Sequence, residues 1–64
     1  MEIEKKYSQK QYIAKMKRLI ESLEQGKSFS IQVKGKKITV PANSEISIEY
    51  EKDEENELEF QIKW

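Results

Sequence analysis

The sequence predicts an α+β fold in a single domain that spans residues 1–64, with the order β-α-β-β-β-β. Two observations lead to this class. Apolar residues recur at helical spacing in the first part of the chain, and after Gly26 they recur at every second position. A chain of 64 residues has room for one domain with one thin core. We therefore expect a short N-terminal strand and one amphipathic helix packed on a four-stranded antiparallel meander.

Residues 1–7 form the first element that we expect. Ile3 and Tyr7 are apolar and charged residues lie between them, which is a weak alternation. This pattern indicates a short edge strand. The strand must join one edge of the meander, either antiparallel to the last strand or parallel to the first, and the pattern leaves both arrangements open.

The helix is the clearest element. Ser8 fits the N-cap, and Gln11 three residues later completes a capping box. Gly26 suits a left-handed stop at the C-terminus. The helix is therefore predicted from about Gln9 to Gln25. Between these signals the apolar residues form a stripe about 120° wide, as expected for a helix with one face on a core. The stripe consists of Tyr12, Ile13, Met16, Leu19, Ile20 and Leu23.

Four segments after Gly26 alternate apolar and polar residues, the pattern of half-buried strands. Their apolar positions are, in chain order, Phe29, Ile31 and Val33; Ile38 and Val40; Ile46, Ile48 and Tyr50; Leu58, Phe60, Ile62 and Trp64. Gly35 supplies the positive φ that a tight hairpin needs. Pro41 ends the second of these strands and turns the chain. Short connections of this kind favour a meander.

Trp64 is the only tryptophan and the last residue of the sequence. It has the same parity as Phe60 and Ile62, so its ring is expected on the helix side of the sheet. We expect a partly exposed lid that packs on the helix; the alternative is a contact residue for a partner.

The composition excludes several kinds of chemistry. The chain has no Cys and no His, which removes thiol nucleophiles, disulfides, the usual general base and the commonest metal ligands. The first residues lack the apolar segment of a secretion signal, and no stretch is apolar enough to span a membrane. We expect a cytoplasmic protein that is not an enzyme, binds no cofactor or metal and does not associate with membranes.

The net charge is zero, but the two parts of the chain differ. Residues 1–37 hold ten Lys and Arg and four acidic residues, a net charge of +6. Residues 38–64 hold two Lys and eight acidic residues, a net charge of −6. Surface charge mostly serves solubility, and opposite ends that lie side by side would neutralise each other.

A basic cluster, Lys34, Lys36 and Lys37, surrounds Gly35 at the expected hairpin tip. Such a tip could contact phosphates, which gives an alternative function as a weak nucleic-acid-binding module. An exposed turn rich in lysine is also ordinary solubilising chemistry. No aromatic residue lies among these lysines, as a single-strand binder would need.

An acidic ladder, Glu49, Glu51, Glu57 and Glu59, is expected on the sheet face opposite the core. Like charges across a ladder destabilise it, so the ladder could receive a cationic partner. It could also pair with nearby lysines or keep the open face from associating. An open face offers no cleft to raise a catalytic pKa, and residues 53–57 lack the spacing of a calcium loop.

Several stretches together resemble the amphi-Trp domain, a short bacterial and archaeal module. They are "YSQKQY", "LIESLEQGKS", "EISIEYE" and the terminal "ELEFQIKW". The resemblance covers nearly the whole chain and supports the boundaries of the predicted fold. It implies no activity, cofactor or catalytic residue.

The sequence therefore predicts a small non-catalytic interaction module, with a protein as its partner. Its candidate contact residues are the basic cluster, the acidic ladder and Trp64. We expect a monomer or a weak homodimer that forms through a sheet edge or the acidic face.

Overall fold

A computed structural model describes residues 1–64, which form one helix and four strands. Helix α1 spans Gln9–Gln25, as predicted. At its start the Ser8 Oγ accepts from the Gln11 backbone N–H at 3.2 Å, and the Ser8 N–H donates to Gln11 Oε1 at 3.2 Å. This capping box satisfies two amide groups that the helix leaves without partners.

The end of α1 is a Schellman motif. Gly26 has φ 64° and ψ 34°, the left-handed conformation, and its N–H donates to the Leu23 carbonyl at 3.2 Å. The Lys27 N–H donates to the Ser22 carbonyl at 3.0 Å. These bonds satisfy carbonyl groups at the end of the helix, and the chain leaves the helix axis at this point.

Strands β1 (Phe29–Val33) and β2 (Lys36–Val40) form an antiparallel hairpin. Both residues of its two-residue turn have positive φ, 50° at Lys34 and 79° at Gly35. Positive φ at both central positions is typical of a type I′ turn, whose twist matches that of paired strands. The prediction of a hairpin at Gly35 is confirmed.

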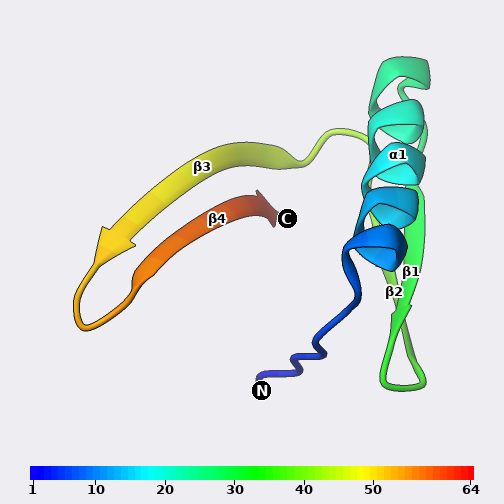
Figure 1. Ribbon diagram of the computed structural model, residues 1–64. Coiled ribbons are helices and arrows are strands. Elements are labelled where there is room, and N and C mark those ends of the chain that lie inside the picture. The colour runs from blue at the N-terminus through cyan, green and yellow to red at the C-terminus, as the bar shows by residue number, and fades with distance from the viewer.

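Helix α1 packs along β1 (Figure 1). Phe29 and Val40 are directly paired across the hairpin, and they are the two buried residues of the chain, each 8% exposed. The Arg18 side chain covers this end of the hairpin. Its guanidinium carbon lies 5.4 Å from the centre of the Phe29 ring, and its Nη2 donates to the Ser30 carbonyl at 3.1 Å.

Strands β3 (Glu45–Lys52) and β4 (Asn56–Lys63) form a second antiparallel hairpin, which extends away from α1, β1 and β2 (Figure 1). The α+β class is confirmed, but the single four-stranded meander is not, because β2 and β3 do not pair. Pro41 follows β2 directly and has no N–H with which to continue a ladder. The Ser44 Oγ donates to the Pro41 carbonyl at 2.6 Å, which closes a local turn between the hairpins.

The expected N-terminal strand is also not confirmed, because residues 1–8 contain no strand. The segment is held through Tyr7, which lines one hollow together with Tyr12 of α1. The Nζ atoms of Lys5 and Lys15 lie 5.2 Å and 5.1 Å from the centre of the Tyr7 ring. Contacts with the helix therefore replace pairing with a sheet.

The separation of the two hairpins gives the chain an open shape. Its radius of gyration is 12.8 Å, whereas a compact chain of this length would have roughly 10.7 Å. Side chains of α1 and of the second hairpin line one cleft, which is part of the candidate site.

Candidate interaction surface

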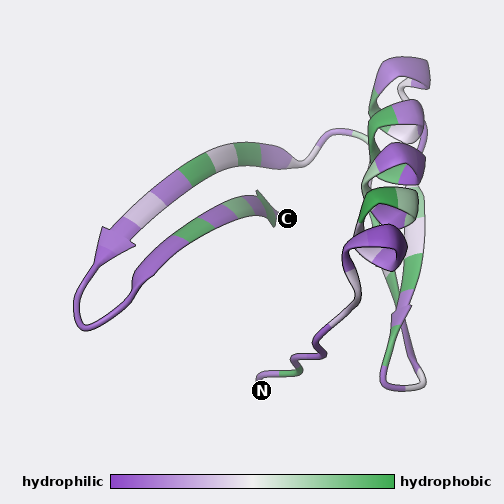
Figure 2. Ribbon diagram, in the orientation of Figure 1, coloured by the Kyte–Doolittle hydropathy of each residue, from purple (hydrophilic) through white to green (hydrophobic).

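The second hairpin has one apolar face, which follows from its register. Ile46 pairs with Ile62, Ile48 with Phe60, and Tyr50 with Leu58. Directly paired residues lie on the same face of an antiparallel ladder, so these six side chains form one patch, which we call the hairpin apolar face. Figure 2 shows the alternation of apolar and polar positions along both strands.

The hairpin apolar face is largely exposed. Ile48 is 64% exposed and Phe60 is 55% exposed, and Ile62 alone among the six is half-buried. The sequence alternation had predicted that these positions form the core under the helix. The structure places them on the surface because the hairpin is not joined to β2.

The stripe of α1 is only partly covered as well. Met16 and Leu19 are half-buried, while Tyr12 and Ile20 are each 49% exposed. The stripe is wider than the β1–β2 hairpin can cover, so part of it remains open to the second hairpin.

An apolar cleft of about 440 Å³ lies between the α1 stripe and the β3–β4 hairpin. Its lining residues are Tyr12, Met16, Leu19, Ile20, Leu23, Ile46, Ser47, Ile48, Phe60, Gln61 and Ile62. Apolar pockets of this size bind ligands or partner side chains. The walls of the cleft come from both parts of the molecule.

The opposite face of the hairpin is polar and contains the acidic ladder. Glu49 pairs with Glu59, and Glu51 pairs with Glu57. The Gln61 side chain offsets the repulsion between the carboxylates of the first pair. Its Nε2 donates to Glu49 Oε2 at 2.7 Å and to Glu59 Oε2 at 2.8 Å, so one amide group bridges two carboxylates. The sequence had suggested pairing of these carboxylates with nearby lysines and not with Gln61.

Three carboxylates of the ladder converge near the tip. Oxygens of Glu51, Glu57 and Glu59 lie within 4.8 Å of one another. The nearby charge of Glu59, a hydrogen bond with Glu59 and the charge of Glu51 raise the pKa of the Glu57 carboxyl above its ordinary value. These carboxylates, two exposed and that of Glu59 half-buried, could supply part of the oxygen shell of a hard cation, but Ca²⁺ takes 6–8 oxygen ligands.

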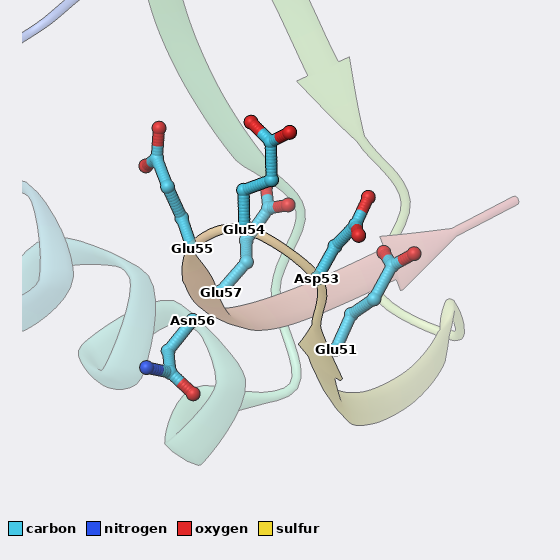
Figure 3. A pocket seen from close by; sticks show the side chains of 6 residues that line it. All are labelled: Glu51, Asp53, Glu54, Glu55, Asn56 and Glu57. Carbon is cyan, nitrogen blue, oxygen red and sulfur yellow. The ribbon is translucent and has the colours of Figure 1, made fainter.

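The tip of the hairpin forms an acidic hollow. Figure 3 shows its carboxylates directed to one side and the Asn56 amide to the other. The Asn56 side chain accepts a hydrogen bond from the Tyr50 hydroxyl. The acidic residues that line this hollow are Glu51, Asp53, Glu54, Glu55 and Glu57.

The basic cluster lies at a different place. Lys34, Lys36 and Lys37 are exposed at the β1–β2 turn, and the tips of the two hairpins are far apart (Figure 1). The structure therefore does not bring the basic cluster and the acidic ladder into one site.

Trp64 differs from its expected position. It lies beyond the end of β4, is 65% exposed and does not line the cleft. The ring is not a lid on the helix, because the hairpin itself stands away from α1 (Figure 1).

Sequence reasoning did not identify the hairpin apolar face as a candidate site. Its alternation cannot distinguish a face buried in the same chain from one left for a partner. The available signal was Pro41, which interrupts the series of strands between Val40 and Ile46.

Comparison of the chain with protein-family models, with curated proteins and with solved structures gives no match. The structure contains no helix with the length and apolarity needed to cross a bilayer.

Proposed function

We propose that the chain is a small non-catalytic interaction module whose partner binds at the apolar cleft between α1 and the β3–β4 hairpin. The single observation that carries this proposal is the exposure of the hairpin apolar face. Ile46, Ile48, Tyr50, Leu58 and Phe60 are each between 55% and 64% exposed. Contiguous exposed apolar patches of this kind mark interaction sites.

Two features agree with a binding role. The cleft is lined almost entirely by aliphatic and aromatic side chains, and one wall belongs to a helix that is capped at both ends. The acidic face opposite keeps the other side of the hairpin soluble, as charged residues do on exposed sheets. We also propose a cytoplasmic location and a relationship to the amphi-Trp domain. Both rest on the amino-acid sequence alone.

A photo-crosslinking residue tests the proposal. It is placed at position 48, on the hairpin apolar face, and in a matched variant at position 49, on the polar face of the same strand. We expect adducts in cell extract from position 48 and far fewer from position 49. Equal yields from the two positions, or none from either, would refute a partner at the apolar face.

A further inference from the structure

We propose that the partner is a second copy of this chain, and that two copies form a twofold homodimer in which each hairpin apolar face is covered by the other protomer. This inference rests on the proposed function, since it names the occupant of the same surface. Three independent observations lead to it.

The first observation is the area of the accessible surface. The chain exposes 5,851 Å² at a mass of 7.6 kDa, whereas a typical folded monomer of this mass would expose about 4,300 Å². The excess is roughly 1,500 Å² per chain on that scale, or roughly 3,000 Å² for two copies. Obligate homodimers bury 2,000–5,000 Å² in total, so a dimer accounts for the excess.

The second observation is that the β3–β4 hairpin has little support within its own chain. α1 packs on β1, and each hairpin is held chiefly by pairing of its own two strands. An isolated two-stranded hairpin is at best marginally stable in water and needs packing on another element. A second protomer supplies that packing, and small chains commonly gain their stability in this way.

The third observation is the distribution of charge. Residues 1–40, which contain α1, β1 and β2, carry the net charge of +6, and residues 41–64, which contain the second hairpin, carry −6. Two such chains related by a twofold axis can place each acidic hairpin beside the basic part of the other. The net charge of zero adds no overall repulsion.

Two basic residues of α1 lie beside its apolar stripe. Lys10 and Lys17 lie three residues before and four residues after Ile13 in α1, so both flank the outer margin of the apolar stripe. A hairpin that docks on this margin through its apolar face meets an apolar surface with two ammonium groups at its edge. Twofold symmetry closes the assembly at two copies, because each surface is used once.

This inference revises the expectation of a weak dimer through a sheet edge or the acidic face. That expectation assumed that the apolar positions of β3 and β4 were buried within the chain. Because those positions are exposed, association through the apolar face buries more apolar surface than association through a sheet edge or the acidic face.

Sedimentation equilibrium of the unmodified chain gives the direct test. We expect a mass of about twice 7.6 kDa at micromolar concentration, retained at high salt because apolar burial is the main attraction. A mass of 7.6 kDa at every concentration would overturn the proposal, whether the hairpin stays open or closes on its own helix.

A pair of variants locates the interface. The double substitution Ile48→Thr with Phe60→Thr removes an apolar cross-strand pair but keeps strand propensity. We expect it to raise the dissociation constant at least about 30-fold, the effect of interface hot spots. The matched control, Glu51→Thr with Glu57→Thr, changes a directly paired position on the opposite face and should leave the mass unchanged. If the control pair weakened the dimer and the Ile48 and Phe60 pair did not, the interface would not lie on the apolar face. Circular dichroism verifies that each variant is folded.

The crosslinking experiment separates the two proposals. An adduct from position 48 with twice the chain mass supports the second copy. An adduct of any other mass keeps the interaction module and overturns the homodimer. Absence of adducts rejects both.

Discussion

Ile48 and Phe60 face each other across β3 and β4, and both side chains are more than half exposed, at 64% and 55%. An isoleucine–aromatic pair of this kind usually stabilises a sheet from inside a core. Here the same pair lies at the centre of an open surface, and its exposure underlies the functional proposal.

Substitution of Gln61 should destabilise the β3–β4 hairpin. Gln61→Leu keeps a side chain of similar size but removes the amide that bridges Glu49 and Glu59. We expect a loss of about 1–2 kcal/mol in the free energy of unfolding, the low end for hydrogen bonds to charged groups, because the site is only half-buried. Urea denaturation measures it. In a Glu49→Gln background the loss should shrink, and an undiminished loss would mean that the amide does not act through the carboxylates.

Substitution of Lys34 should stabilise the first hairpin. Lys34 has φ 50° in the type I′ turn, a conformation that asparagine adopts more readily than lysine. Lys34→Asn creates an Asn-Gly turn, and we expect a gain of about 0.5–1 kcal/mol in the free energy of unfolding. Thermal denaturation gives the measurement. Lys36→Asn, in the adjoining strand β2, is the control and should bring no gain.

The pH dependence of stability should contain a contribution from Glu57. Its pKa is raised above 4.5 in the folded chain, chiefly by the charge of Glu59. The folded chain therefore holds this proton more tightly than the unfolded chain. The stabilising contribution is complete below about pH 4.5 and is lost as the pH rises through the raised pKa.

Glu57→Gln removes this titration, so the difference in unfolding free energy between the variant and the parent should grow between acid and neutral pH. Denaturation at a series of pH values measures that difference. Glu24→Gln, on α1, serves as the control. A difference that stays constant with pH would contradict the proximity of the three ladder carboxylates.

Trp64 should contribute little to the stability of the monomer. A buried tryptophan typically costs 3–5 kcal/mol when truncated to alanine, but this ring is 65% exposed. We expect Trp64→Ala to lower the free energy of unfolding by less than about 1 kcal/mol, and the parent's tryptophan emission to be red-shifted in dilute solution. Blue-shifted emission of the parent, together with a large loss of stability in Trp64→Ala, would instead indicate that the ring packs on the helix.

The sequence predicted the local structure well where the signals are local. Ser8, Gln11 and Gly26 specify the helix because each forms bonds within a few residues of itself. Gly35 specifies a hairpin in the same way. The strand parities also agree with the observed register, because the side-chain period of a strand is fixed by its backbone geometry.

The arrangement of the elements could not be predicted to the same degree. Parity tells which side chains share a face but does not tell what covers that face. Ile46 and Phe60 have the pattern of a core whether the core belongs to one chain or to two. The meander was therefore predicted from short connections, and the effect of Pro41 on pairing between β2 and β3 was underestimated.

In the acidic ladder, too, the sequence predicted which residues share a face but not the contacts that their side chains make. The register predicted that Glu49 and Glu59 share a face, and the structure confirms this. The compensation by Gln61 depends on the conformation of a side chain from β4, which no pattern of residue types specifies.

Protection of the hairpin apolar face from a thiol reagent measures most directly whether a second copy of the chain covers it. The chain has no cysteine, so Ile48→Cys introduces one thiol on this face and Glu49→Cys introduces one on the polar face of the same strand. The rate of thiol labelling is followed over a range of protein concentrations. We predict that labelling at position 48 slows as the concentration rises, while labelling at position 49 stays fast. Fast labelling at position 48 at every concentration would contradict the claim that this face is covered by a second copy of the chain.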